Sequence, residues 1–348
     1  MKRALLALTL ALAGAHAPTA AQASQPSGWS EAVVSVRDLA AASELFEQFG
    51  WSVVGRGRVG RAELDYWHLP RLASAQFRKI CARPVREGCI RFIAFSGVPQ
   101  RPIRLGTRPW DTGGTFSLMI RTDNVRAAFD AAIAAGWHAE SEPYRFAFGS
   151  SDLWNVVLSS PQGFNIALYE RVSPPFNDYP LTRLSQAFNA MRMVRDQRAS
   201  VAFYTRLGFS KAFDSDYVDP APTTTNFSIP KNYATRIVRR AAAMHPVASG
   251  TGRVELMQFV GFEGKDQSAY AAAPNLGILS LRFPVRGLAD YRARLVEAGV
   301  PAVQRGEGIA IGALGRVDVF AVRDPDGNLN EFYAESADDG LDQRPVAR

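Results

Sequence analysis

The chain repeats itself, and this internal repeat constrains its fold more than any other feature. The segment "EAVVSVRDLAAASELFEQFGW" (31–51) matches "NAMRMVRDQRASVAFYTRLGF" (189–209). In both copies an alternating segment is followed by Val-Arg-Asp, and then by an amphipathic segment that ends in glycine and an aromatic residue. Because aspartate is a favoured helix N-cap and glycine commonly ends a helix, each copy predicts a strand followed by a helix.

A second unit of the same kind also occurs twice, as "SLMIRTDNVRAAFDAAIAAGW" (117–137) and "SLRFPVRGLADYRARLVEAGV" (280–300). The segments that close the units repeat as well. "GCIRFIAFSG" (88–97) matches "GRVELMQFVG" (252–261), and "LSSPQGFNIALYE" (158–170) matches "VRDPDGNLNEFYAE" (322–335). We therefore predict four modules, each built from a strand, a helix and several further strands.

These matches set the predicted domain bounds. We expect modules at about residues 28–97, 112–172, 184–262 and 275–336. We expect the first two to form an N-terminal domain, residues 28–172, and the last two a C-terminal domain, residues 184–336. The proline-containing stretch 173–183 is typical of a linker, and the charged tail 337–348 is expected to be loose.

The N-terminus has the pattern of a secretory signal peptide, predicted to span residues 1–23. Lys2 and Arg3 precede a short apolar run, and Ala21-Gln22-Ala23 fits a cleavage site before Ser24, with Ala15-His16-Ala17 as the alternative. No segment reaches the roughly 18 apolar residues that a membrane span needs. The sequence therefore predicts a periplasmic or secreted protein without a stable membrane anchor.

The two cysteines, Cys81 and Cys89, lie on either side of a turn in a predicted hairpin. In an exported protein a disulfide between them is expected, because export places the thiols in an oxidising compartment. Two small buried thiols are the alternative.

The basic charge of the chain does not favour a nucleic-acid partner. The formal net charge of +7 comes almost wholly from arginine, since the chain has five lysines. Proteins that bind single-stranded nucleic acid typically interleave basic and aromatic residues. In this chain the arginines are scattered and show no such interleaving. A small-molecule ligand is expected instead.

The repeats resemble the vicinal oxygen chelate superfamily, which includes glyoxalase I, bleomycin-resistance proteins and extradiol dioxygenases. The resemblance covers residues 28–336 and rests on the two Val-Arg-Asp units and on Asp-Pro-Asp-Gly-Asn-x-x-Glu-Phe near the C-terminus. It implies an α+β fold in which four βαβββ modules form two cup-shaped, curled mixed sheets. The four-module length is most similar to the extradiol dioxygenases, where one half commonly carries the chemistry and the other is degenerate.

In this family, side chains on the first and last strands of each module hold a metal. Counting back seven residues from each predicted helix cap gives the first-strand positions Glu31, Ser117, Asn189 and Ser280. The corresponding last-strand positions are Arg91, Ala167, Glu255 and Glu331.

The resemblance therefore implies that the N-terminal cup holds Glu31, Arg91, Ser117 and Ala167. A carboxylate that faces a guanidinium is not a metal site, because the fixed positive charge takes the place of the ion. We expect a Glu31–Arg91 ion pair and a degenerate cup.

The C-terminal cup is expected to hold Asn189, Glu255, Ser280 and Glu331, which offer only oxygen donors. Such a set suits Mg²⁺, Mn²⁺ or Ca²⁺ and disfavours Zn²⁺ or Fe²⁺, because imidazole is missing. Dioxygenase chemistry on non-haem iron is disfavoured for the same reason. Without a metal, the two carboxylates would repel each other and raise at least one pKa, which suits a general acid or base.

Strand alternation predicts the remaining lining of the C-terminal cup. The side chains on the same faces as these positions are Met191, Met193, Met257, Arg282 and Tyr333. A soft apolar lining with a polar centre suits an aromatic or apolar ligand that carries an oxygen group. Alternatively, these residues fill the cup as core, and Arg282 either neutralises a carboxylate or binds an acidic substrate.

Two classes of function remain open. One is an exported enzyme, similar to a lyase or isomerase, in which Glu331 and Glu255 act as acid and base or as metal ligands. The other is a non-catalytic protein of the bleomycin-resistance type that sequesters a small molecule. The oligomeric state also stays open, although a monomer is feasible because four modules can complete both cups.

The stretch "DPDGNLNEFYAE" from Asp324 to Glu335 is similar at first sight to a calcium-binding loop. Its glycine, Gly327, is at the fourth position, whereas a calcium loop has glycine at the sixth. Pro325 and Gly327 instead predict a tight turn, followed by a strand that carries Glu331.

Overall fold

The structure, a computed structural model, describes residues 24–104, 106, 108–175, 183–218, 227, 229, 231–246 and 251–336. The predicted signal peptide with its cleavage motif, most of the predicted linker and the tail 337–348 lie outside these residues. No helix in the described ranges is both long and apolar enough to cross a membrane.

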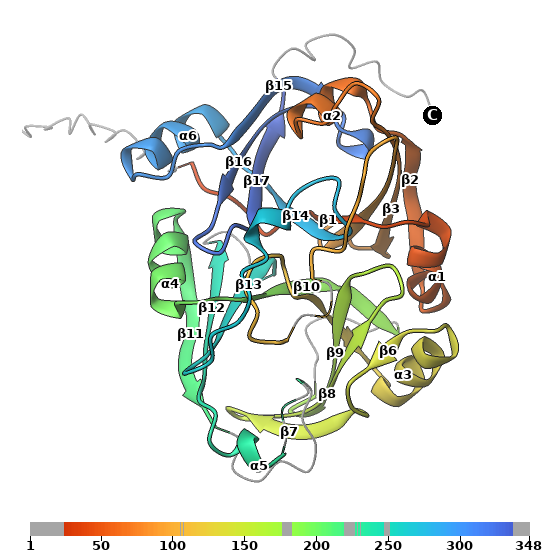
Figure 1. Cartoon of the computed structure of the whole chain (residues 1–348), viewed down its shortest axis with the longest axis vertical. Helices are drawn as coiled ribbons and strands as arrows, with labels where there is room; N and C mark the ends of the chain where they lie inside the picture. The colour runs from red at the N-terminus through yellow and green to blue at the C-terminus, as the bar shows by residue number, and fades with distance from the viewer. Residues whose placement is uncertain are drawn as a thin grey trace, which may run out of the picture.

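The strands form two mixed sheets, one in each half of the molecule (Figure 1). The first has eight strands in the order β15-β16-β17-β14-β1-β4-β3-β2, and we call it the 1/4 sheet after its modules. Its strands are β1 (Glu31–Ser35), β2 (Trp51–Arg58), β3 (Ser74–Ala82), β4 (Cys89–Ser96), β14 (Gly277–Pro284), β15 (Gln304–Ala310), β16 (Arg316–Arg323) and β17 (Leu329–Glu335).

The second sheet has nine strands, with the order β11-β12-β13-β10-β5-β9-β8-β6 and with β7 paired to β8, and we call it the 2/3 sheet. Its strands are β5 (Ser117–Thr122), β6 (His138–Ala139), β7 (Tyr144–Phe148), β8 (Ser151–Ser159), β9 (Asn165–Ser173), β10 (Leu184–Met193), β11 (Phe209–Tyr217), β12 (Arg239–Pro246) and β13 (Arg253–Phe259). The predicted fold class, α+β modules in two curled mixed sheets, is confirmed.

The order in which the modules pair differs from the prediction. We expected neighbouring modules to share a cup, but β1 of the first module pairs antiparallel with β14 of the fourth. In the same way, β5 of the second module pairs with β10 of the third. The physical reason is that all four modules present the same kind of first strand, so their backbone hydrogen bonds do not select a partner. Which modules pair therefore depends on side chains that differ from module to module.

Each module contributes one helix to the outside of its sheet. The four helices are α1 (Leu39–Gln48), α3 (Val125–Ala134), α4 (Gln197–Arg206) and α6 (Leu288–Glu297). Figure 1 shows α1 and α3 along one side of the molecule and α4 and α6 along the other. Two short helices, α2 (Arg61–Tyr66) and α5 (Lys231–Ala234), and two 3₁₀ turns, η1 (Ser268–Tyr270) and η2 (Gly312–Leu314), complete the elements.

The helix caps follow the sequence prediction. Asp38 caps α1, with its Oδ1 accepting hydrogen bonds from the backbone N of Ala40 at 2.8 Å and of Ala41 at 3.0 Å. Asp196 caps α4 in the same way. Gly50, which follows α1, has a φ of 95°, a conformation that favours glycine.

The apolar core has three parts. The largest packs the helices against the outer faces of both sheets and includes Phe46, Tyr204, Tyr291 and Phe332, all nearly fully buried. The other two parts lie in the concave faces of the 1/4 sheet and of the 2/3 sheet. The molecule therefore has one shared core and two separate cups.

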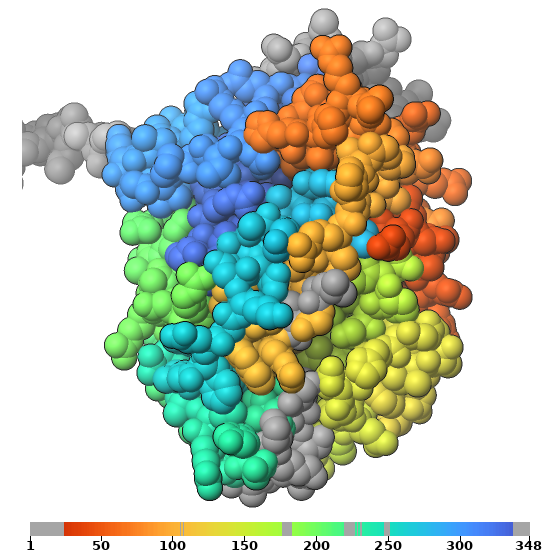
Figure 2. All heavy atoms as spheres, in the orientation of Figure 1, coloured from red at the N-terminus to blue at the C-terminus, as the bar shows by residue number. Residues whose placement is uncertain are grey.

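Two chain connections run from one sheet to the other side by side. The connection from β4 to β5 meets the connection from β13 to β14 at two isolated bridges, Pro102 to Leu276 and Thr112 to Asp266. Figure 2 shows them, in gold and cyan, along one face of the molecule. They hold the two sheets together on this face.

The predicted turn at Asp324 is present, and it also ties the two sheets together. Asp324 Oδ1 accepts hydrogen bonds from the backbone N of Asp326 and of Asn328, which is typical of a tight turn. Asp324 Oδ2 lies 3.0 Å from Nη1 of Arg192 in the 2/3 sheet, and both side chains are almost fully buried. The turn is thus a structural element that carries a buried ion pair between the sheets.

Cys81 at the end of β3 and Cys89 at the start of β4 form a disulfide bond across this hairpin, with Cα atoms 4.5 Å apart. The hairpin geometry that the sequence predicted accounts for this short distance.

We predict that Arg192→Met lowers the free energy of unfolding by about 3 to 5 kcal/mol, because it leaves Asp324 charged and buried without its partner. Urea denaturation at pH 7 measures the change. Arg240→Met is the control, because Arg240 pairs with the half-exposed Asp216 and should give a clearly smaller loss. If both variants lost the same free energy of unfolding, burial of the Arg192–Asp324 pair would not increase its contribution to stability.

Candidate functional site

The cup of the 1/4 sheet is filled by a buried cluster of six charged side chains, which we call the charge cluster. Its centre is Arg282, whose Nη1 lies 2.9 Å from Glu31 Oε1 and whose Nη2 lies 2.9 Å from Glu63 Oε1. Its Nε binds Glu331. Arg91 binds Glu63, and Lys79 Nζ lies 2.8 Å from Glu31 Oε2. Three cations therefore balance three carboxylates.

The short helix α2 closes this cup. It brings Glu63 between Arg91 and Arg282, and Trp67, which follows it, donates a hydrogen bond from Nε1 to Glu331 Oε1 at 3.2 Å. Glu63 and Glu331 are fully buried. A ligand has no access to these side chains in this arrangement.

The cations of the charge cluster keep two of its carboxylates, Glu31 and Glu63, ionised. Burial alone would raise the pKa of Glu31, but the charges of Lys79, Arg282 and Arg91 outweigh burial and lower it to about 2. The same balance between burial and the charges of Arg91 and Arg282 lowers the pKa of Glu63. These carboxylates are held as permanent anions and do not titrate near neutral pH.

Several predictions for the cups are corrected here. Glu331 does not share a cup with Glu255, because β17 belongs to the 1/4 sheet and β13 to the 2/3 sheet. Arg282, Ser280 and Tyr333 lie with Glu331, away from the expected ligand site. The expected Glu31–Arg91 pair is also replaced, since Glu31 binds Lys79 and Arg282 while Arg91 binds Glu63 from α2. The sequence pattern gave no indication that α2 would supply a charge.

The cup of the 2/3 sheet contains a cavity of about 220 Å³. Strands β5, β7, β8 and β9 of the second module line one part, and strands β10 to β13 of the third module line the rest. The described lining is Met119, Arg121, Tyr144, Phe146, Phe148, Ser151, Leu153, Tyr169, Arg171, Phe188, Asn189, Met191, Phe213, Ser215, Tyr217, Phe227, Arg239, Ala241, Glu255 and Met257. Most of these side chains are aromatic or apolar, which is typical of a small-molecule site.

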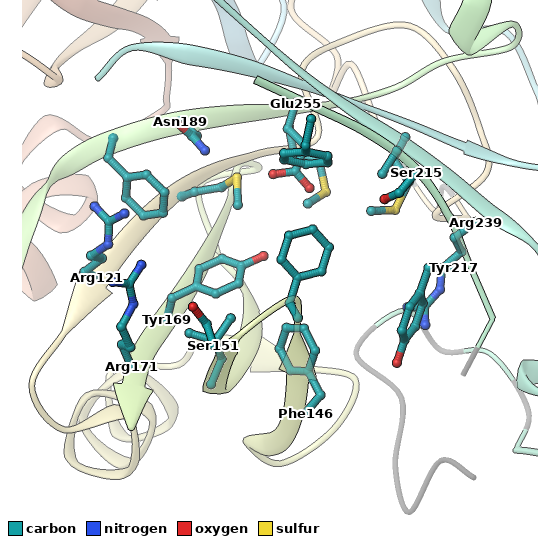
Figure 3. A pocket seen from close by; sticks show the side chains of 18 of the residues that line it. Arg121, Phe146, Ser151, Tyr169, Arg171, Asn189, Ser215, Tyr217, Arg239 and Glu255 are labelled. Atoms are coloured by element: carbon teal, nitrogen blue, oxygen red, sulfur yellow. The ribbon is translucent and has the colours of Figure 1, made fainter. Parts of the chain in front are cut away.

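Glu255 is the one acidic side chain in the described lining of this cavity. It is 9% exposed, and its carboxyl group points into the cavity (Figure 3). It makes no side-chain hydrogen bond or ion pair with the part of the chain that the structure describes. Burial raises the pKa of Glu255 to about 7, against a smaller opposing effect of Arg253. The carboxyl can therefore both give and take a proton near neutral pH.

Two polar side chains lie in the same cavity as Glu255. Asn189 is 6% exposed, and its Oδ1 has no hydrogen-bond partner among the described residues. The Tyr169 hydroxyl points toward the centre of the cavity (Figure 3). Burial and the charge of Glu255 raise the pKa of Tyr169 well above its usual value, so this hydroxyl keeps its proton and can donate it in a hydrogen bond.

Arginines lie at the two ends of the cavity. Figure 3 shows Arg121 and Arg171 at one end and Arg239 beside Tyr217 at the other. The Arg121 guanidinium lies 3.8 Å from the ring centre of Phe188, and the Arg239 guanidinium lies 4.5 Å from that of Tyr217. These cation–π contacts fix the orientation of both guanidinium groups.

The structure thus brings together part of the predicted site. Glu255, Asn189, Met191 and Met257 line the cavity, and Met193 is buried in the surrounding apolar cluster. The residues that the sequence analysis missed come mainly from the second module, which was taken as degenerate. A signal for three of them was present, since Arg121 follows Ser117 on the same strand face, and Tyr169 and Arg171 follow Ala167.

A family model matches part of this chain. Residues 187–332 match the model of the "Glyoxalase/Bleomycin resistance protein/Dioxygenase superfamily". The matched stretch runs from β10 to β17, so it contributes to both sheets. No curated protein gives a significant match.

Solved structures share the fold over nearly the whole chain. Glyoxalase I from Zea mays aligns with a TM-score of 0.58 and 17% identity, over 88% of this chain and 92% of that protein. A putative dioxygenase from Bacillus subtilis subsp. subtilis str. 168 aligns with a TM-score of 0.52 and 10% identity, over 90% and 86% of the two chains. At these identities the likeness concerns the fold.

The positions that would hold a metal in such a fold carry few suitable ligands. In the 2/3 cup they carry Asn189, Glu255, Ser117 and Ala167, with one carboxylate, two neutral oxygens and no imidazole. The arginines at both ends of the same cavity add positive charge that opposes a divalent cation. The 1/4 cup offers carboxylates that are already bound by cations. These residues do not fit a catalytic metal.

We predict that Glu331→Gln destabilises the protein by about 3 kcal/mol at pH 7, because the charge cluster then holds an excess buried cation. Denaturant unfolding measures this change. If stability stayed the same while ligand binding or turnover fell, Glu331 would have to act at the cavity after all.

Glu255→Gln should have the opposite effect on stability at high pH. The folded-state pKa of about 7 lies above the ordinary value of 4.5, so ionisation of Glu255 costs stability as pH rises from 4.5 to 7. Above pH 7 the cost is roughly 3 kcal/mol. We therefore expect the variant to be more stable than the wild type at pH 8, and the difference to shrink toward pH 4.5. Parallel stability curves between pH 4.5 and 8 would contradict this expectation.

Proposed function

Because residues 187–332 match the Glyoxalase/Bleomycin resistance protein/Dioxygenase superfamily, we propose that the chain is an enzyme of this superfamily whose active site is the cavity of the 2/3 sheet. The proposed reaction is a proton transfer on a small aromatic or apolar compound that carries a carbonyl group, in the manner of an isomerase or lyase. The single observation that carries the proposal is the buried Glu255 carboxyl, which faces the cavity without a hydrogen bond or ion pair in the described chain.

A buried carboxyl without a partner costs folding free energy, and function is a sufficient reason to keep it. In the proposed step the Glu255 carboxylate takes a proton from the carbon next to the substrate carbonyl. The carbonyl oxygen gains negative charge and accepts hydrogen bonds from the Tyr169 hydroxyl and the Asn189 amide. Glu255 then returns the proton to another atom, which isomerises the substrate, or protonates a leaving group, which completes an elimination.

Sequestration without chemistry is the second candidate, and the composition of the cavity favours it. Methionine and aromatic side chains such as Met191, Met257 and Phe188 adapt to ligands of several shapes. In that case a ligand would protect the protein against thermal unfolding and would itself undergo no chemical change.

We also propose that the protein is exported and acts in the periplasm or outside the cell, as a monomer or a larger assembly. The basic and apolar N-terminal stretch supports export. The Cys81–Cys89 disulfide is consistent with it, because disulfides persist mainly in oxidising compartments.

Solvent deuterium exchange tests the catalytic proposal and does not require the product to be identified. A panel of aryl ketones, with and without a carboxylate, is incubated with the protein in D₂O, and mass spectrometry follows deuterium next to the carbonyl. We expect exchange on at least one compound, with Glu255→Gln lowering its rate by about 100-fold or more. Arg240→Met is the control, because Arg240 lies outside the cavity lining.

Exchange that is equally fast in wild type and Glu255→Gln would remove Glu255 from the mechanism. Thermal protection by a compound that never exchanges would favour the sequestration candidate.

A further inference from the structure

The described lining of the 2/3 cavity carries more positive than negative charge. Three arginines line it, Arg121 from β5, Arg171 from β9 and Arg239 from β12, against one acidic side chain, Glu255. A guanidinium keeps its charge at every physiological pH. Within the described lining the positive side chains therefore outnumber the negative ones even when Glu255 is ionised.

Arg121 and Arg171 form a local pair within this lining. Strands β5 and β9 are parallel neighbours with Arg121 opposite Tyr169, so Arg171, two residues further along β9, projects from the same face as a diagonal neighbour. Figure 3 shows both guanidinium groups at the same end of the cavity, with Tyr169 between them and Glu255. Two like charges this close favour an anion between them.

Both arginines offer several hydrogen-bond donors. Each makes a further interaction within the chain, but a guanidinium has five N–H donors, so a partner in the chain leaves donors for a ligand. The Phe188 ring holds the Arg121 guanidinium in place from one side. A guanidinium oriented in this way is suited to bidentate contact with a planar carboxylate.

The path from this arginine pair to Glu255 is lined by aromatic surface. The cavity lining includes Tyr169, Phe146 and Phe188. The Tyr169 side chain points toward the middle of the cavity (Figure 3). Aromatic rings bind well against such side chains in offset or edge-to-face contact.

We propose that Arg121 and Arg171 form an anion subsite, and that the cavity takes a small aromatic carboxylate. Its carboxylate binds this arginine pair, its ring packs against Tyr169 and Phe188, and its reactive end reaches Glu255. The inference rests on the proposed function, because it names the substrate class of the same cavity.

Small phenyl compounds with different polar groups test the subsite by calorimetric titration of the full protein. Benzoate, benzamide, benzylamine and phenylphosphonate share the ring and differ in charge and shape. We expect benzoate to bind about tenfold or more tightly than benzamide, and its affinity to fall with added salt, because the contact is charge-assisted. We expect no detectable binding of benzylamine.

Variants assign the effect to the arginine pair. Arg121→Met and Arg171→Met should each weaken benzoate binding by about tenfold or more, with benzamide binding unchanged within about twofold. Arg240→Met removes the same charge from β12 outside the cavity lining and should leave both affinities unchanged. The comparison of benzoate with benzamide on the wild type decides the question even if a variant fails to fold.

Equal affinities for benzoate and benzamide, or tighter binding of benzylamine, would overturn the anion subsite. Tighter binding of phenylphosphonate than of benzoate would overturn the assignment to a carboxylate. Failure of the proposed function has a separate readout. Selective benzoate binding without any deuterium exchange would refute the catalysis and support the subsite. Exchange only on uncharged ketones would support the catalysis and refute the subsite.

Discussion

The contacts of Arg282 with Glu31, Glu63 and Glu331 are the interaction on which the arrangement of the molecule depends. A buried guanidinium needs hydrogen-bond acceptors and a counter-charge around it, and two of these three carboxylates come from the first module while Arg282 itself comes from the fourth. The backbone pairing of β1 with β14 is common to any two such modules. The charges are specific, because Arg282 contacts Glu31 and Glu63 only when the first and fourth modules share one sheet.

The two cups have the same fold but differ in whether their buried carboxylates are paired with cations. In the 1/4 cup each of the three carboxylates has a cation, α2 and the following Trp67 close the space, and the group is structural. In the 2/3 cup Glu255 has no such partner in the described chain and faces a cavity instead. The first arrangement keeps Glu31 and Glu63 ionised. The second leaves the Glu255 carboxyl able to gain or lose a proton near neutral pH.

The internal repeat predicted the modules, their helix caps and the fold class, because these depend on local patterns such as Val-Arg-Asp before a helix and glycine after it. It did not predict which modules pair, because this depends on contacts between Arg282 and residues far away in the sequence. That single error moved Glu331 into the expected ligand site. Glu255 and Asn189 reached the cavity as predicted, since their strand face is set locally, whereas Arg121 and Arg171 belonged to a module that was set aside.

The pairing of first with fourth and second with third modules makes the topology nested. The inner 2/3 sheet joins modules that are adjacent in the chain, so β5 and β10 pair over a much shorter stretch of sequence than β1 and β14 do. The outer 1/4 sheet joins the ends and requires contacts across nearly the whole sequence. Loop closure is slower for distant contacts, so the sheet that holds the cavity can form first. The first module leaves the ribosome before the others, but the contacts of its Glu31 and Glu63 with Arg282 can form only once the last module has been made.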